Sequence, residues 1–225
     1  MAVSVPLLAP RSSDEHDPQP KRPVDRRVEE LVTTVGVGAA SRLGIELAAY
    51  LSGQMGTAAT LLALNEAHGD VYFDVPSEAA VDPAAAEATF RSRAAVIDVQ
   101  THPVRTSRAT TRGAEALFGF LMLRRPSEAA HVLGKLLLAV GPALILWGTD
   151  SVWYGPPPAL IDAFRSFVIP EPMQERYGYP ALTPEMKAAI LGGNAAGLYG
   201  VDTAPSPIDP AQLAEARAEL ARRLP

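Results

Sequence analysis

The chain has 225 residues and a formal net charge of −5 at pH 7, so it lacks the basic field that nucleic acid binding requires. It contains no cysteine, which excludes disulfides and cysteine-ligated zinc or iron–sulfur sites. A histidine-rich metal centre would have to draw on four residues, which are His16, His68, His102 and His131.

Residues 1–26 hold five prolines and few large apolar side chains, which predicts a disordered N-terminal tail. Arg26 and Arg27 precede an apolar region, as in twin-arginine export signals. However, Glu29 and Glu30 follow where such signals are uncharged. We therefore expect a cytoplasmic protein, with export or membrane association as the alternatives.

Residues 27–93 are predicted to form a helical region followed by a linker. Leu43, Leu47 and Leu51, and then Leu61 and Leu62, recur at helical spacing. Residues 47–65 are uncharged and approach the ~20 residues that span a bilayer. Gly53 and Gly56 predict a helix break within this run, and polar residues also interrupt it. We therefore favour two helices packed against protein, and a membrane anchor at 47–65 is the second interpretation.

The end of this region carries acidic residues and turn signals typical of a solvated linker. Asp82 followed by Pro83 predicts a short helix to Phe90, with Asp82 as the N-cap and Pro83 in the first helical position.

Two short apolar runs, 95–100 and 143–148, end in polar side chains. Gln100 is the last residue of the first run and His102 lies two residues beyond it, whereas Thr149 and Asp150 follow the second run. Such runs are typical of buried parallel strands, and α/β enzymes keep catalytic and metal-binding groups at the carboxyl ends of these strands. The alternative for Asp150 is a capping residue in a strand-to-loop turn.

Between these runs, residues 103–126 give the weakest signals. The apolar piece 117–123 is either a strand or a short helix, which periodicity alone does not separate. Residues 127–141 form a predicted amphipathic helix with Ser127 as the N-cap. Its predicted buried stripe consists of Leu133, Leu136, Leu137 and Val140.

The last third of the chain predicts short helices separated by rigid loops. Residues 159–167 are a predicted helix, and segments 169–172 and 177–180 are predicted loops. Thr183 caps a predicted helix 184–191, a glycine break follows, and Asn194 caps a turn at 195–199. A final helix opens at Asp209, and we expect it to serve packing or assembly; its leucines Leu213, Leu220 and Leu224 share one face.

Three stretches together resemble the amidohydrolase-related family of metal-dependent hydrolases. They are Val96-Ile-Asp-Val-Gln-Thr-His102, the apolar-Gly-Thr-Asp sequence ending at Asp150, and Ile190-Leu-Gly-Gly-Asn-Ala-Ala-Gly-Leu-Tyr-Gly200. In that family the first strand reads Ile-Asp-x-His-x-His, and the fold is a (β/α)₈ barrel that binds a divalent metal.

The resemblance implies roles for four residues. His102 matches a histidine ligand, and Asp150 matches the last-strand aspartate that binds the metal and either deprotonates the attacking water or assists C–C cleavage. Gln100 stands where the family has its first histidine ligand, and we expect Gln100 and Trp153 to shape the substrate pocket. Because a catalytic zinc needs about three protein ligands, we expect only weak binding of zinc or manganese.

Chain length conflicts with a complete barrel. The gap between His102 and Leu144 holds little more than one βα unit of ~30 residues. We therefore predict an α/β fold, namely a partial (β/α) barrel remnant with parallel strands, preceded by an α-helical region. The predicted organisation is a tail (1–26), a helical region with linker (27–93), a truncated barrel (94–202) and a C-terminal helix (203–225).

Two functions follow from this sequence. The first is a metal-dependent hydrolase of a small carboxylate, amide or lactone-type substrate, impaired by an internal deletion. The alternative is a non-catalytic remnant or interaction protein, a homo-oligomer that self-associates through exposed sheet edges. Neither function involves nucleic acid.

Overall fold

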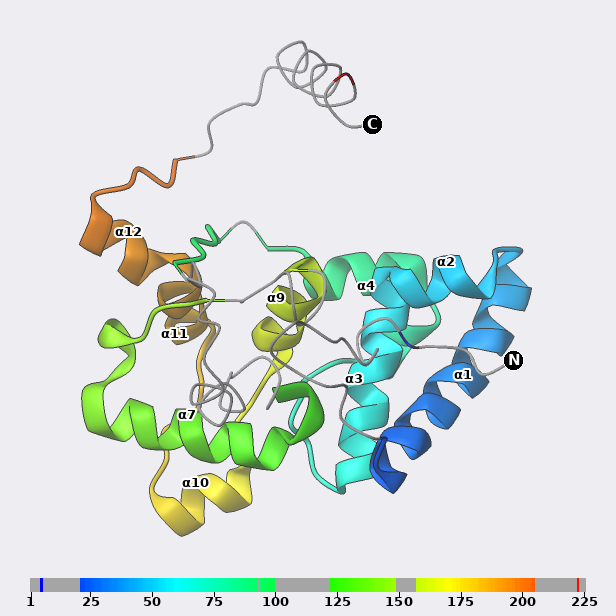
Figure 1. Cartoon of the computed structure of the whole chain (residues 1–225), viewed down its shortest axis with the longest axis horizontal. Helices are drawn as coiled ribbons and strands as arrows, with labels where there is room; N and C mark the ends of the chain where they lie inside the picture. Colours follow the sequence, from blue (N-terminus) through cyan, green and yellow to red (C-terminus); the bar gives the residue numbers. More distant parts are fainter. Residues whose placement is uncertain are drawn as a thin grey trace.

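The computed structural model describes residue 5, residues 21–92, 94–99, 122–148 and 157–204, and residue 222. Helices dominate these residues (Figure 1). In chain order the α-helices are α1 (Pro23–Leu43), α2 (Leu47–Ser52), α3 (Gln54–His68), α4 (Pro83–Phe90), α7 (Pro126–Val140), α9 (Pro157–Ser166), α10 (Glu171–Tyr177), α11 (Pro184–Ala188) and α12 (Asn194–Tyr199). Shorter turns are η2 (Ser77–Ala80), η3 (Pro142–Leu144) and the π-helical turn η4 (Ala189–Gly193).

The predicted α/β barrel remnant is wrong. The described residues form no sheet, and their strand pairing is limited to one isolated antiparallel bridge between Phe73 and Phe167. The segment 94–99 is extended, but its backbone donors bond to different elements. Ile97 donates to Leu191 in a helical turn, whereas Val99 donates to Trp147. Single hydrogen bonds of this kind do not build the repeating ladder of a sheet.

The second predicted strand, 143–148, begins as a turn and not as a strand. Residues Pro142–Leu144 curl into the 3₁₀ turn η3, and the Leu144 side chain is 74% exposed. Only Trp147, at the end of the apolar run, is buried at 5% exposure. Self-association through open sheet edges therefore has no counterpart in the described part of the chain.

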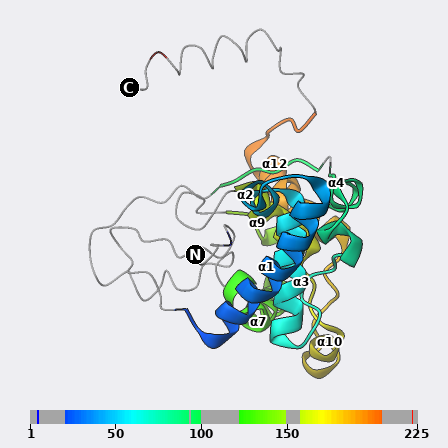
Figure 2. The ribbon, with the colours of Figure 1, turned by 90° about the vertical axis from the view of Figure 1, so that its right-hand side faces the viewer.

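The N-terminal helices form a bundle in which α1 lies along α3 (Figure 2). Pro23 begins α1, inside the segment that the sequence assigned to a tail. The predicted helical region is confirmed, and the break between α2 and α3 falls at Gly53, which separates a six-residue helix from a fifteen-residue helix. Gly56 lies inside α3 rather than at a break.

The membrane interpretation of residues 47–65 finds no support in this geometry. Among the helices of the described residues, none is long and apolar enough to cross a bilayer. Tyr50, Leu51, Leu61 and Leu64 are instead buried in the protein core.

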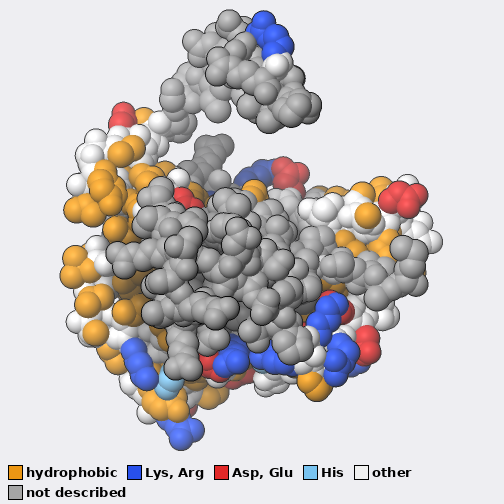
Figure 3. All heavy atoms as spheres, viewed as in Figure 1, with side chains coloured by type: hydrophobic (Ala, Val, Ile, Leu, Met, Phe, Trp, Pro, Cys, Tyr) orange, Lys and Arg blue, Asp and Glu red, His pale blue; other side chains and the backbone are white. Residues whose placement is uncertain are grey.

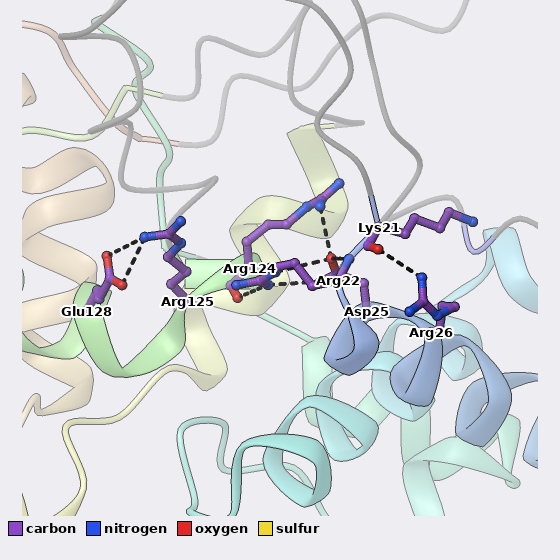
Figure 4. Close-up of polar contacts among 7 residues, drawn as sticks. All are labelled: Lys21, Arg22, Asp25, Arg26, Arg124, Arg125 and Glu128. Atoms are coloured by element: carbon purple, nitrogen blue, oxygen red, sulfur yellow. Dashed lines mark hydrogen bonds and ion pairs between the residues drawn. The ribbon is translucent and has the colours of Figure 1, made fainter.

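Two contacts tie this bundle to the second half of the chain. Around the Phe73–Phe167 bridge, Asp74 N–H donates to the Ser166 carbonyl at 2.7 Å and Val168 N–H donates to the Tyr72 carbonyl at 2.8 Å. At the start of α1, Asp25 accepts hydrogen bonds from Arg22 and Arg124 (Figure 4). Burial alone would raise the pKa of Asp25, but the hydrogen bonds and charges of these two arginines outweigh it and lower the pKa.

The amphipathic helix predicted at 127–141 is present as α7, with two corrections. Arg125 is the N-cap and Ser127 lies within the first turn, because Pro126 occupies the first helical position. The buried stripe includes Leu133 and Leu137, but Leu136 and Val140 are exposed. Small residues take their place in the core, which are Ala129, Ala130 and Gly134.

The helix at α9 agrees with the prediction, whereas α10 replaces a predicted loop. Pro172 had suggested a rigid loop, but it lies in the first turn of α10, where a missing N–H costs no helical hydrogen bond. From Pro184 to Tyr199 the chain is one helical run, since the residues that flank η4 keep right-handed helical backbone angles. The predicted glycine break is therefore a widened turn.

Candidate functional site

All four predicted site residues, Gln100, His102, Asp150 and Trp153, lie outside the described residues, so their roles remain predictions. The structure describes the backbone that leads to them. The segment 94–99 ends directly before Gln100, and the segment 145–148 ends two residues before Asp150. These two segments meet at the π-helical turn η4, and we refer to the three together as the η4 junction.

The first contact of the η4 junction uses a backbone carbonyl of the turn. A π-turn shifts helical bonding from i→i+4 to i→i+5 and can leave a carbonyl to bond outside the helix. Here the carbonyl oxygen of Leu191 accepts a hydrogen bond from the Ile97 N–H at 2.9 Å. Leu191 itself is buried at 1% exposure, so this bond lies in the interior.

The second contact depends on the absence of a side chain at Gly192. The Ala95 backbone crosses the turn so closely that a β-carbon on Gly192 would overlap the Ala95 carbonyl group. Only glycine permits this approach at the observed spacing. Gly192 thus allows segment 94–99 to pack directly on the helix, and it does not end the helix.

The third contact is made by the Asn194 side chain. Its amide nitrogen donates to the Pro142 carbonyl and to the Ile145 carbonyl, both at 2.8 Å. These bonds hold the chain as it leaves η3 and enters segment 145–148. Asn194 was predicted to cap a following turn, but it is helical and bonds across about fifty positions of sequence.

A direct bond then joins the two segments. Val99 N–H donates to the Trp147 carbonyl at 3.1 Å. The Trp147 ring packs against Phe164 of α9 at a centroid distance of 4.9 Å. Its buried indole N–H has no hydrogen-bond partner among the described residues, which is an uncommon state for a buried donor.

The side chain of Lys187, which is close in sequence to the η4 junction, lies at the C-terminal end of α9. The sequence alone did not identify this residue. Lys187 of α11 is buried, and its Nζ donates to the Arg165 carbonyl at 2.6 Å. A cation is favourable there because helix C-termini carry unpaired carbonyls and partial negative charge. Burial lowers the pKa of Lys187 to about 8, an effect that the charge of Asp74 partly offsets.

Asp162, one turn earlier on α9, is also buried. Burial raises its pKa to about 6, against the opposing influence of Arg165, whose guanidinium lies 3.5 Å away. The signal for both groups is a charged residue between apolar positions of a helix, but the sequence does not say whether such a residue is buried.

The described residues do not form a metal site. No three His, Cys, Asp or Glu side chains among them lie close enough together to hold an ion. His131 packs against Tyr177 and shares a hydrogen bond with the Tyr179 hydroxyl at 2.9 Å, so its described contacts are packing contacts.

Comparison with protein families matches residues 119–201 to a family described as amidohydrolase. The match includes Asp150, Trp153 and the η4 turn, and it begins after Gln100 and His102. Searches of curated proteins and of solved structures returned no match.

Proposed function

Since this chain is amidohydrolase-related through residues 119–201, we propose that it hydrolyses a small amide, lactone or carboxylate substrate, with Asp150 as its general base. The family relation supports a hydrolase-like function. The substrate class, the site residues and the metal are parts of the proposal.

The observation that carries the proposal is the η4 junction. Its bond between Val99 and Trp147 sets two chain segments side by side just before the proposed site residues. His102 follows Val99 by three residues, and Asp150 follows Trp147 by three residues. Because a chain advances at most ~3.6 Å per residue, neither residue can lie far from the bond between Val99 and Trp147. This geometry supports a shared site for the two side chains.

In the proposed reaction, the Asp150 carboxylate accepts a proton from water while the water oxygen attacks the substrate carbonyl carbon. The tetrahedral intermediate then collapses, the C–N or C–O bond breaks, and the leaving group takes up the proton that Asp150 had accepted. Gln100 and Trp153 would orient the substrate, because an amide and an indole N–H both donate hydrogen bonds to carbonyl oxygen.

A divalent metal, usual in this family, would polarise the carbonyl or the water when bound. His102 and Asp150 are the two residues that the resemblance gives it, which is fewer than the about three protein ligands of a catalytic zinc. Among the described residues, no three His, Cys, Asp or Glu side chains lie together to supply further ligands.

The test compares the wild type with Asp150→Asn and His102→Gln on a panel of small amides and lactones, with and without added zinc or manganese. We expect slow hydrolysis that Asp150→Asn lowers by roughly 100-fold or more, the range of general base catalysis. Asp70→Asn, which changes a carboxylate in the loop after α3, is the matched control and should keep full activity. Hydrolysis that Asp150→Asn leaves unchanged would refute the assignment of the base.

The metal content of the purified wild type shows, independently of activity, whether the protein binds a metal. Equimolar metal that Asp150→Ala loses would show that the site has more ligands than His102 and Asp150. Absence of both hydrolysis and metal binding in folded protein would contradict the enzyme proposal.

A further inference from the structure

One side of the molecule presents an apolar surface that runs from α7 through η3 to α12. Figure 3 shows hydrophobic side chains along this side, over the same elements. We call it the α7–α12 face, and its large exposed side chains are Val132, Leu136, Val140, Leu144, Leu198 and Val201.

The α7–α12 face is continuous because η3 and α12 are held together. Asn194, in the first turn of α12, bonds to Pro142 and Ile145 on either side of η3. Leu198 follows Asn194 by four residues and so projects from the same side of α12. On α7, Val132, Leu136 and Val140 are also spaced by four residues and form one stripe.

This face carries almost no charge. Lys135 is the single charged residue between positions 132 and 144, and positions 193–201 contain none. Exposed apolar surfaces of this kind mark places where another segment or molecule binds.

We propose that the α7–α12 face is the docking surface for the C-terminal segment of the same chain, residues 209–224. That segment lies outside the described residues, and its helix is predicted from sequence. Leu213, Ala216, Leu220 and Leu224 recur at spacings of three and four, which gives one apolar stripe of helical period. In a helix of this register Glu219 would lie at the flank of the stripe, where it could pair with Lys135.

Chain connection favours this occupant over a second molecule. The chain leaves the face at Val201, which is itself part of it. Residues 202–208 include two prolines and extend ~3.1 Å each, or ~20 Å, which exceeds the ~12 Å length of α7 between Val132 and Val140. A tether of this length keeps the segment at a local concentration on the order of millimolar.

Cross-linking within the full chain tests the proposal. The chain contains no native cysteine, so only the introduced thiols react with the cross-linker. The variant Ala139→Cys/Ala216→Cys places one thiol beside Leu136 and one on the predicted stripe. A short bismaleimide should join them within one molecule, giving a cross-linked species of monomer mass. The control Val37→Cys/Ala216→Cys uses an exposed position on α1 and should give no intramolecular product.

Hydrogen exchange of the full chain gives a second, independent measurement. We expect Leu136→Glu to speed exchange of backbone amides in residues 209–224 by roughly tenfold or more, since a buried carboxylate would weaken docking. Val37→Glu, an equally charged change on α1, should leave that exchange unchanged.

Three results would overturn the proposal. A cross-linked product of dimer mass would place a second copy on the face instead. A folded double-cysteine variant without cross-link, confirmed with Val132→Cys and Val140→Cys in place of Ala139→Cys, would leave the face uncovered by this segment. Fast exchange of residues 209–224 in the wild type would exclude a docked helix. None of these outcomes depends on hydrolytic activity.

Discussion

The backbone of Ala95 crosses Gly192 in direct contact, at the centre of the π-helical turn between α11 and α12. This contact joins the extended segment before Gln100 to the part of the chain that matches the amidohydrolase family. The geometry of the proposed site therefore depends on a position that has no side chain of its own.

Gly192→Ala should destabilise the protein. The added methyl group would overlap the Ala95 carbonyl, which is backbone and cannot rotate away, and overpacking of this kind costs about 1–3 kcal/mol. Urea unfolding followed by circular dichroism measures the change. Gly197→Ala is the matched control, because a β-carbon there meets no atom within 4 Å, and it should be neutral or stabilising. Equal stability of the two variants would contradict the close crossing.

Asn194→Ala should lower the free energy of unfolding by about 1–3 kcal/mol, because two carbonyl groups near η3 lose their donor. Asn194→Asp keeps the shape but replaces the donor by an acceptor that faces two carbonyl oxygens, so it should cost at least as much. An aspartate variant as stable as the wild type would show that the side-chain amide does not bind these carbonyls.

Lys187 should make stability depend on pH in the alkaline range. Its pKa falls from 10.5 to about 8 on folding, so between these values the unfolded chain binds more protons than the folded one. The free energy of unfolding should therefore rise with pH across this window, and the rise is lost as pH falls through about 8. Lys187→Met should abolish this contribution, which denaturant titrations of both proteins at pH 7.5 and 10 would reveal. If the free energy of unfolding changed with pH by the same amount in both proteins, the buried charge of Lys187 would be contradicted.

Asp162 should act in the opposite direction at acidic pH. Burial raises its pKa from 3.8 to about 6, so the folded state binds more protons between these values. Its favourable contribution is present below pH 3.8 and is lost as pH rises through about 6. Asp162→Asn should thus gain stability relative to the wild type between pH 4 and pH 7. Glu175→Gln on exposed α10 is the surface control, and the prediction fails if Asp162→Asn shows no such change.

Local signals predicted several helix boundaries correctly. Asp82 caps α4 by accepting from the N–H groups of Ala84 and Ala85, and Thr183 caps α11 by accepting from Met186. Each interaction spans two or three residues, so the pattern that encodes it is contained in a short stretch of sequence. The break at Gly53 is of the same kind.

Features that depend on distant partners could not be predicted in this way. An apolar run such as 143–148 fits a strand, or a turn followed by a short extended segment, equally well until its hydrogen-bond partners are known. The role of Asn194 depends on carbonyls at Pro142 and Ile145, which no local pattern connects to it. The same limit applies to burial of Lys187 and to the exposure of Leu136.

For the candidate site, the sequence identified the three stretches that meet at the η4 junction, although it assigned two of them to strands. The resemblance supplied this grouping, and the family match over residues 119–201 confirms it for the last two stretches. The roles of Gln100, His102, Asp150 and Trp153 remain predictions, and the variants at Asp150 and His102 test two of them.

The π-helical turn η4 also determines the directions in which the side chains of α12 project relative to those of α11. Such a turn holds one residue more than an α-helical turn, so removing one residue from 189–193 would restore an uninterrupted α-helix. Each residue of an α-helix rotates the chain by about 100°, and a deletion would turn the face of α12 by that angle relative to α11. Asn194 would then point away from η3, and Leu198 would leave the apolar face. One inserted residue thus allows Asn194 to bond to the carbonyls beside η3 while Leu198 lies on the apolar face.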